Sequence, residues 1–389
     1  MHIKTEKPVV LISAVNINEG GPLSILLDAV NTFMSACIND YRLVLLIHKR
    51  EIFAEYIGNT AVEICEYKYP KRSWLLRAWF EYIHCFFISK NIKPDVWISL
   101  NDITPNIVTK NKVVYCQNPA PFYQLDSKQY FNEKKLLFFH FFYGFFYRIN
   151  IRSNKYVIVQ QEWLKHAFIR RFKLNNVLVA HPDVLMPSIP DTHQPGSENF
   201  SFFFPALPRA FKNFEVLIDA AEKLHERNKH FEVLFTFSGN ENSYAAKLVN
   251  EYHNRPYLKF IGIQSRDKIW SLYQTSSCLV FPSLMETWGL PISEAKLFNK
   301  PILVADLQYA HETVGEYGKA CFFDANDPVA LAGLMEKAIN GSLQYDSPCY
   351  VKPQEPFVRS WKELYDLILS GIIENKVDTQ FKLSTIPDA

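Results

Sequence analysis

Two glutamates eight residues apart, Glu286 and Glu294, bracket a Gly-Leu-Pro turn in the stretch ETWGLPISEA (286–295). The apolar run before them, SCLVFPS (277–283), predicts a buried strand, and Pro291 suits the first turn of a following helix. A carboxylate in a first helical turn, as predicted for Glu294, is stabilising by itself, whereas Glu286 in the loop has no such explanation. Two carboxylates placed this way could hold two hydroxyl-rich groups, such as a ribose and a sugar joined by a diphosphate.

A second candidate cluster is cationic and lies in FPALPRAFKNFEVLIDA (204–220), where Arg209 and Lys212 follow a predicted strand. We expect a helix to begin at Asn213, because asparagine is a favourable N-cap residue. Cations at a helix N-terminus oppose the helix dipole and are poor choices for stability alone. Either an anion lies between Arg209 and Lys212, or the two are ordinary solvated loop charges.

A glycine pair, Gly20 and Gly21, separates the first predicted strand from its helix in NEGGPLS (18–24). Glycine lets a backbone approach a ligand closely and a helix N-terminus attracts anions, although a plain tight turn is the alternative. The sequence contains no Gly-x-Gly-x-x-Gly, no Walker A motif, no His-Glu-x-x-His and no Asp-x-Asp pair. A bound nucleotide diphosphate would therefore be met by backbone N–H groups and basic side chains, with no divalent metal required and no other cofactor.

Short apolar runs alternate with helix-length amphipathic segments along the chain, which predicts parallel sheets covered on both faces. We therefore predict an α/β fold of two Rossmann-like, doubly wound domains that face a cleft. The alternation breaks at a proline-rich segment and then restarts. The predicted parts are an N-terminal domain at 1–182, a linker at 183–199, a C-terminal domain at 200–358, a helix at 359–372 that packs back across both domains, and a tail at 373–389.

Composition narrows the class of protein. The chain has 389 residues, 48% of them apolar and 21% charged, which is typical of a globular protein with more than one core. A formal net charge of +2 gives no general attraction to nucleic acid. The seven cysteines are odd in number and include no Cys-x-x-Cys pair, so they favour a reducing cytoplasmic compartment over a disulfide framework or a zinc site.

The stretch PSLMETWGLPISEA resembles the E-x7-E signature of the retaining glycosyltransferases of family four, which have the GT-B fold. The segment ALPRAFKNFEVLIDAAEKL and the residues on both sides of the glutamate pair agree with that family. In the N-terminal half, NINEGGPLSILLDAVN and VIVQQEWLKHAFIRRF (157–172) are similar to the family's acceptor domain, though less specifically. The resemblance covers about residues 9 to 372 and implies an enzyme of bacterial surface-polysaccharide synthesis.

The resemblance also implies roles for individual residues. Glu294 would bind the ribose hydroxyls of the nucleotide, Glu286 the transferred sugar, and the pair of cations the donor diphosphate. Arg209 lies nearer to Lys212 than is usual in the family. Further donor contacts would come from the loop Ile261–Gln264, which faces the base, and from backbone groups of the glycine pair and of the turn; these residues are Ile263, Gly20, Gly21, Gly289, Leu290 and Pro291.

One departure from the family pattern concerns Gln117, which stands where many relatives have a histidine after the strand in KVVYCQNPAPF. A glutamine can hydrogen-bond a sugar but cannot act as a general base. Retention in this family is thought to use attack on the same face of the sugar, with the leaving phosphate accepting the proton of the acceptor hydroxyl. Gln117 would then contribute hydrogen bonds to the catalytic site.

These observations predict a metal-independent hexosyltransferase that uses a UDP- or GDP-sugar and a glycan or lipid-linked acceptor, as in O-antigen or capsule synthesis. One alternative is a non-catalytic polysaccharide-assembly or binding protein with the same fold, which Gln117 favours. Another is a sugar-nucleotide epimerase. A phosphorylase would be much longer.

Two aromatic-rich stretches with basic flanks, residues 69–90 and 133–155, carry a separate hypothesis. The longest apolar run, 136–147, is too short to cross a bilayer. Basic residues beside a Trp/Phe/Leu face are typical of a helix that lies in a membrane interface, and two buried helices covering the sheet are the alternative. We therefore expect a cytoplasmic protein with peripheral contact to the inner face of the membrane.

Overall fold

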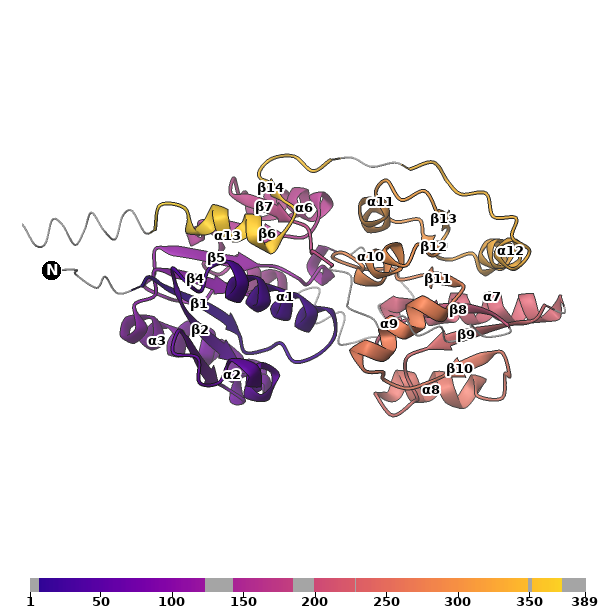
Figure 1. The fold of residues 1–389 in the computed structure, drawn as a ribbon, viewed down its shortest axis with the longest axis horizontal. Coiled ribbons are helices and arrows are strands. Elements are labelled where there is room, and N and C mark those ends of the chain that lie inside the picture. Colours follow the sequence, from indigo (N-terminus) through magenta and orange to yellow (C-terminus); the bar gives the residue numbers. More distant parts are fainter. Residues whose placement is uncertain (1–6, 123–142, 185–198, 228, 349–351, 373–389) are drawn as a thin grey trace, which may run out of the picture. The chain divides into compact units, whose positions relative to one another are not determined.

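The computed structural model describes residues 7–122, 143–184, 199–227, 229–348 and 352–372. The chain divides into two compact units, residues 1–183 with 353–389 and residues 184–352. Each unit is built on one parallel sheet with helices on its faces (Figure 1), which confirms the predicted pair of doubly wound α/β domains. Most of the predicted linker and the predicted tail at 373–389 lie outside the described residues.

The sheet of the first unit has eight described strands, in the order β14-β7-β6-β5-β4-β1-β2-β3, and all of its pairings are parallel. The order changes direction between β1 and β4, which is where a doubly wound sheet binds ligands. The strands are β1 (Val9–Ala14), β2 (Arg42–Ile47), β3 (Val62–Glu66), β4 (Val96–Ser99), β5 (Asn111–Tyr115), β6 (Tyr156–Val159), β7 (Val177–Ala180) and β14 (Phe357–Val358).

Alternation along the strands explains why both faces of this sheet are covered. In β1, Val10 and Ile12 belong to the core that includes α1 and α13, whereas Leu11 belongs to the core beneath α2 and α3. Since both sides are apolar, the strand reads as one continuous apolar run. The helices are α1 (Gly20–Ala36), α2 (Trp74–Trp79), the π turn η3 (Phe80–His84), α3 (Cys85–Ile92), α6 (Glu162–Phe172) and α13 (Trp361–Leu369), with 3-10 turns η1 (Arg50–Tyr56), η2 (Tyr69–Lys71), η4 (Ala120–Phe122) and η5 (Ile151–Ser153).

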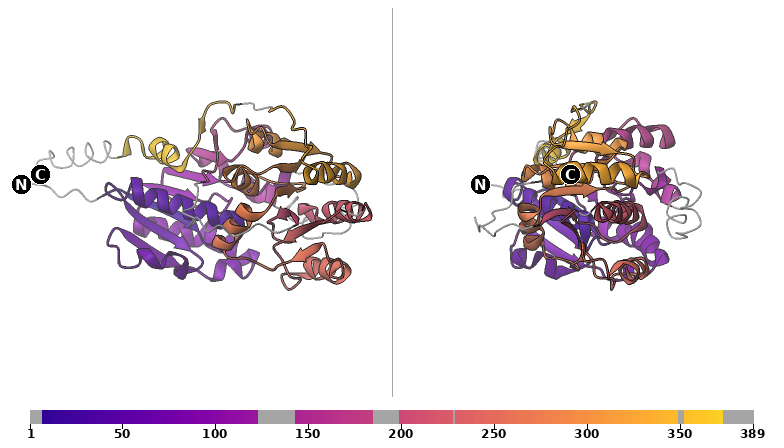
Figure 2. Two further views of the ribbon diagram at one scale, coloured as in Figure 1. Left: turned by 45° about the vertical axis from the view of Figure 1, so that its right-hand side comes forward. Right: turned by 90° about the vertical axis from the view of Figure 1, so that its right-hand side faces the viewer.

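The C-terminal elements β14 and α13 belong to the first unit. β14 pairs with β7, although the predicted C-terminal domain extended to residue 358. α13 packs on α1, where the Tyr365 hydroxyl donates to the Ala29 carbonyl at 2.8 Å, and the two helices lie side by side in Figure 1 and Figure 2. The apolar stripe of α13 is therefore buried within one unit, whereas the sequence prediction placed this helix across both.

The sheet of the second unit has six described strands, in the order β10-β9-β8-β11-β12-β13, again all parallel. Here the order changes direction between β8 and β11. The strands are β8 (Phe200–Phe204), β9 (Phe231–Phe235), β10 (Leu258–Phe260), β11 (Cys278–Phe281), β12 (Ile302–Ala305) and β13 (Ala320–Phe323), and the helices are α7 (Phe214–Glu226), α8 (Ser243–Tyr252), α9 (Arg266–Thr275), α10 (Leu290–Leu297), α11 (Gln308–Val314) and α12 (Pro328–Ile339), with the 3-10 turn η6 (Ala210–Lys212).

One aromatic-rich core joins the helices and the sheet of the second unit. Phe204 of β8 contacts Phe214 of α7 at a ring separation of 4.7 Å, and Phe281 of β11 in an edge-to-face arrangement at 5.8 Å. The carboxyl ends of β8 and β11 are thereby fixed beside each other. Among the described residues, no helix combines the length and the hydrophobicity needed to span a bilayer.

Candidate functional site

The loops that follow β8 and β11 meet at the change of strand order in the second sheet. The Leu284 N–H donates to the Phe211 carbonyl at 2.8 Å, and the Ser283 hydroxyl donates to the same carbonyl at 3.4 Å. Ligands of doubly wound sheets bind at this edge because two neighbouring strands send their loops in opposite directions there. Residues 205–212 and 282–289 therefore form the candidate binding site.

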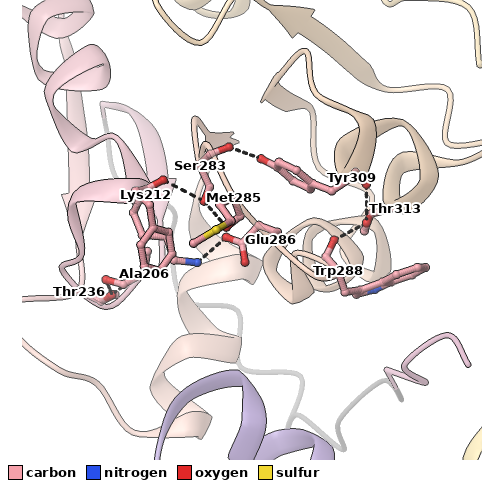
Figure 3. A network of polar contacts seen from close by, with 10 residues as sticks. Ala206, Lys212, Thr236, Ser283, Met285, Glu286, Trp288, Tyr309 and Thr313 are labelled. Carbon is pink, nitrogen blue, oxygen red and sulfur yellow. Dashed lines mark hydrogen bonds and ion pairs between the residues drawn. The ribbon is translucent and has the colours of Figure 1, made fainter. Parts of the chain in front are cut away.

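Lys212 and Glu286 form an ion pair across these loops (Figure 3). Their side chains are only 16% and 14% exposed, so water screens the pair less than a surface pair. The Lys212 ammonium also lies 5.5 Å from the ring centre of Phe211 and 5.7 Å from that of Phe281. An ammonium has three donors and a carboxylate two acceptor oxygens, so this pair can also contact a polar ligand.

Arg209 and Asn213 flank this lysine in different ways. Arg209 is exposed and makes no ion pair within the described part of the chain. Asn213 does precede α7, but its φ of 58° is left-handed and its side chain does not cap the helix. Its amide donates instead to the carbonyls of Ala325, at 2.7 Å, and Pro282, at 3.3 Å. The predicted capping role of Asn213 is therefore wrong, and its side chain ties the two loops together.

Polar contacts behind Glu286 hold its loop against α11 (Figure 3). The Tyr309 hydroxyl donates to the Ser283 carbonyl at 2.6 Å, and the Thr313 hydroxyl donates to the Trp288 carbonyl. The Trp288 indole N–H donates to the Ser293 hydroxyl at 2.9 Å. These bonds fix the direction in which the loop presents Glu286.

Gly289 allows the sharp turn into α10. Its φ of 86° is left-handed, and a Cβ added there would lie 3.2 Å from Ile292 Cδ1 and 3.3 Å from Phe281 Cε1. Leu290 and Pro291 then form the first two positions of α10. The backbone N–H of Leu290 points out of the helix start, where partial positive charge favours an anion, and proline contributes no N–H.

Replacing Gly289 by alanine is expected to destabilise the protein by about 1–3 kcal/mol, because the left-handed conformation and the two close contacts both oppose a Cβ. The matched control is Gly333→Ala in α12, where an added Cβ meets nothing within 4 Å. That control should be neutral or stabilising, since alanine is the better helix former. Urea unfolding curves of the two variants test the prediction, and equal midpoints would contradict it.

Glu294 lies deeper than the sequence analysis expected. α10 begins at Leu290, which makes Glu294 its fifth residue and places it beyond the first turn. Its side chain is only 4% exposed and pairs with Arg266 at 2.7 Å, whereas Arg266 is 46% exposed. Burial, followed by the nearby Glu294 carboxylate, raises the pKa of Tyr273 well above its ordinary value. The carboxylate is thus buried, and its partner Arg266 is half exposed.

Arg266 is a site residue that the sequence analysis missed. It opens α9 directly after the capping Ser265, and its guanidinium lies 4.0 Å from the centre of the Trp270 ring. A cation at the start of a helix opposes the dipole, so the argument applied to Lys212 would also have identified Arg266.

The loop after β10 carries Ile263 on an exposed turn. Gly262 has a left-handed φ of 75°, and the Gln264 amide donates to the carbonyls of Ile261 and Gly262 at 2.5 and 3.1 Å. Ile263 is consequently held away from the core, with two-thirds (67%) of its side chain exposed. This arrangement presents an apolar side chain beside the α9 helix start that carries Arg266.

The remaining predicted residues, Gly20, Gly21 and Gln117, belong to the first unit. The glycines are exposed and form the first two residues of α1, so they lie in the helix start and not in a loop before it. Gln117 follows β5, and its amide donates to the Leu100 carbonyl at 3.4 Å. These three residues therefore lie at the carboxyl edge of the first sheet.

Asp102, which the sequence analysis did not single out, organises this edge. Its partly buried carboxylate accepts from the backbone N–H groups of Gln117 and Asn118 and from the hydroxyls of Tyr143 and Tyr147, at 2.8 and 3.3 Å. Burial raises the pKa of Asp102, and these hydrogen bonds and a nearby arginine act in the opposite direction. An aspartate three residues after the buried strand β4 was the available signal.

The two aromatic-rich stretches meet in this unit as far as the structure describes them. Trp74, at the start of α2, stacks on Phe146 at 5.4 Å and meets Tyr143 edge to face at 5.7 Å. Residues 133–142 of the second stretch lie outside the described residues. One face of α2 and α3 is buried and the other is exposed, so packing of these helices on the sheet is confirmed in part, and contact of the exposed face with a membrane stays a prediction.

The two-sheet architecture, with each change of strand order at a loop-lined edge, is that of the GT-B glycosyltransferases. The sucrose-phosphate synthase of Thermosynechococcus elongatus superposes with a TM-score of 0.64 at 14% identity, covering 97% of this chain and 99% of that one. HepE of Anabaena, in complex with UDP-glucose, superposes with a TM-score of 0.59 at 14% identity, covering 97% and 100%. At such identities the likeness establishes the fold alone.

Sequence comparison adds a more specific relationship for the second unit. Residues 188–348 match the family model described as "Glycosyl transferases group 1". The O-antigen chain mannosyltransferase B of Escherichia coli is 28% identical over 138 residues. That match spans 35% of this chain and 35% of the relative, about a third of each protein.

Proposed function

We propose that this protein is a retaining glycosyltransferase that moves a hexosyl group from a UDP- or GDP-sugar to a glycan or lipid-linked acceptor of bacterial surface polysaccharide. The observation that carries the proposal is the partly buried Lys212–Glu286 pair at the change of strand order between β8 and β11. The match of residues 188–348 to the group 1 glycosyltransferase model supports it, as does the similarity to an O-antigen mannosyltransferase.

In this proposal the donor spans the carboxyl edge of the second sheet. Glu294 and Arg266 meet the ribose end, and the exposed Ile263 covers the base. Lys212, the exposed Arg209 and the backbone at the start of α10 meet the diphosphate. Glu286 accepts hydrogen bonds from hydroxyls of the transferred sugar, with Lys212 holding its carboxylate in place.

The bond that breaks joins the anomeric carbon of the sugar to the terminal phosphate oxygen of the donor. The acceptor oxygen forms the new bond on the same face, and its proton passes to the departing phosphate oxygen. Negative charge grows on the diphosphate as the bond breaks, so a fixed cation stabilises the transition state more than the ground state. In this proposal Lys212 supplies the positive charge, and no divalent metal is required. The reaction takes place in the cytoplasm.

In this proposal Gln117 is assigned to the acceptor side of the reaction, and backbone groups of Gly20 and Gly21 contact the phosphate or sugar of the donor. The Gln117 amide can hydrogen-bond an acceptor hydroxyl, and Asp102 fixes the backbone that carries it. No proton transfer is assigned to Gln117, since an amide has no suitable pKa.

The first test is a thermal-shift series with UDP, GDP, dTDP, CMP and ADP, each in EDTA. One nucleotide is expected to raise the melting temperature without metal, because a ligand at 100 times its dissociation constant adds about 2.7 kcal/mol of stability. The same nucleotide should give a smaller shift with Glu294→Gln. No shift with any nucleotide would contradict the proposal and favour the non-catalytic binding protein, which has the same fold but needs no donor.

A further inference from the structure

A continuous helical segment, formed by α2, the π turn η3 and α3, presents apolar side chains on two faces. The inner face carries Phe80, Cys85 and Ile88, which belong to the core under the first sheet. The outer face carries Leu75, Trp79, Ile83 and Phe87, which we call the apolar ridge. Leu75 is 85% exposed and the other three are between 45% and 56% exposed.

The residues of the apolar ridge are regularly spaced along the helical segment. Its four residues are spaced four apart, and a π turn lies in the middle of the segment. A spacing of four drifts around an ordinary α-helix of 3.6 residues per turn, and the wider π turn reduces that drift. Single exposed apolar residues need no explanation, but a row of large ones marks a contact surface.

A basic pocket of about 620 Å³ adjoins the start of this helix. It is lined by His48, Lys49, Glu51, Lys68, Lys71 and Arg72. Lys71 and Arg72 immediately precede Ser73, which caps α2 by accepting the Leu76 N–H at 3.2 Å. Trp79 of the apolar ridge packs edge to face, at 5.7 Å, on Tyr69 of the 3-10 turn η2 that also contains Lys71.

Positive charges predominate around the apolar ridge, although the basic pocket also contains Glu51. From residue 67 to residue 93 the sequence contains a single acidic residue, Glu81, and this side chain is fully buried. Lys68 pairs with Glu66 at 3.1 Å, but Lys71 and Arg72 have no ion pair within the described residues. Burial lowers the pKa of His48, and the neighbouring Lys71 lowers it further. An anion in the basic pocket would relieve this crowding of positive charge.

We propose that the apolar ridge and the basic pocket together dock this protein on an anionic lipid bilayer. The ridge enters the boundary between headgroups and acyl chains, and Lys71 and Arg72 meet the lipid phosphates. A row of Trp, Phe, Leu and Ile beside clustered cations is the combination by which interfacial helices bind such membranes. The proposal concerns attachment and does not depend on the glycosyl-transfer function.

Charge also argues against a second copy of the chain as the occupant. A symmetric contact of the apolar ridge with itself would bring the same patch from both copies together. Lys71, Arg72 and the exposed Lys90 lie along the patch, so cations would face cations. A bilayer containing acidic lipids supplies the opposite charge over the whole patch.

The test is co-sedimentation of the full-length protein with phosphatidylcholine vesicles, with and without phosphatidylglycerol. Wild type is expected to sediment with the anionic vesicles and to be released by high salt. Because each cation near an anionic surface contributes roughly 1 kcal/mol, Lys71→Gln with Arg72→Gln should lower the partition coefficient by about 30-fold. Leu75→Ser with Ile83→Ser should lower it by at least about tenfold at unchanged salt dependence.

Matched controls come from the second unit. Val329 is 54% exposed and lies outside any apolar row, and Lys247 and Lys337 are exposed on α8 and α12. Val329→Ser and Lys247→Gln with Lys337→Gln should bind vesicles as wild type does. All variants are at exposed positions, so unchanged melting temperatures confirm that they remain folded.

Three results would overturn the proposal. The first is that wild type sediments with neither vesicle, and the second is that it binds neutral and anionic vesicles equally; both would contradict docking through the lipid charge. A dimer in light scattering that Leu75→Ser with Ile83→Ser dissociates, without vesicle binding, would make the apolar ridge an interface between copies. Because none of these measurements uses a nucleotide, their failure is distinguishable from failure of the proposed enzyme function.

Discussion

Replacing Lys212 by methionine is expected to lower kcat for sugar transfer by about 10²–10³, the usual loss when one fixed donor to a developing negative charge is removed. Methionine keeps most of the side-chain volume, so contacts with the Phe211 and Phe281 rings persist while the charge is lost. Initial-rate kinetics with the donor identified by thermal shift measure the effect. Loss of an interaction made in the transition state lowers kcat and kcat/KM together.

Two further variants separate catalysis from general damage. Glu294→Gln should act mainly on the dissociation constant of the nucleotide, because Glu294 is assigned to the ribose and not to the reacting bond. Lys337→Met, on the exposed surface of α12, should leave both kcat and nucleotide binding unchanged. Equal, small effects of Lys212→Met and Lys337→Met would show that the assigned roles are wrong.

The largest loss of stability is expected for Asp102→Ala, at about 3–5 kcal/mol, the range for removing one partner from a buried charged network. Two backbone N–H groups and the Tyr143 hydroxyl would lose the Asp102 acceptor, whereas the Tyr147 hydroxyl keeps the Asn118 carbonyl at 3.1 Å. Alanine would also adopt the left-handed φ of 66° at a cost. At about 2–4 °C per kcal/mol, the melting transition of the first unit should fall by roughly 10 °C.

Asp102→Asn is the matched control for this prediction. Asparagine tolerates the left-handed conformation and keeps one acceptor oxygen. The stability of Asp102→Asn should therefore lie between that of wild type and that of Asp102→Ala. Hydrogen exchange at the amides of Gln117 and Asn118 gives a local readout, since both N–H groups donate to Asp102. Unchanged exchange there in Asp102→Ala would contradict the positioning role of this carboxylate.

The interior strands could be predicted from the sequence, whereas the edges of the sheets could not. Runs such as VVLISAV stand out because both faces of an interior strand are buried, and β1 and β11 lie within them. β3 (VEICE) lies at a sheet edge with only partial burial, and β14 has two residues, so neither gives a continuous apolar run. The pairing of β14 with the first sheet was missed for this reason, whereas the return of the C-terminal helix was predicted.

The candidate site was predictable in its residue types but not in its pairings. Glu286 and Lys212 stood out because a loop carboxylate and a cation at a helix start are poor choices for stability alone. That they pair across 74 positions depends on β8 lying next to β11, which no local pattern encodes. The pairings of Arg266 with Glu294 and of Asp102 with the Gln117 backbone likewise join distant segments, although each residue alone had a local signal in the sequence.

The return of β14 and α13 to the first unit has a consequence for synthesis on the ribosome. The second unit, 184–352, is continuous in sequence and can close its core as soon as it has emerged. The first unit lacks an edge strand and the helix that covers α1 until residue 369 has been made. The apolar face of α1 therefore remains uncovered, and available to chaperones, until α13 is made, although the second unit can already have folded by then.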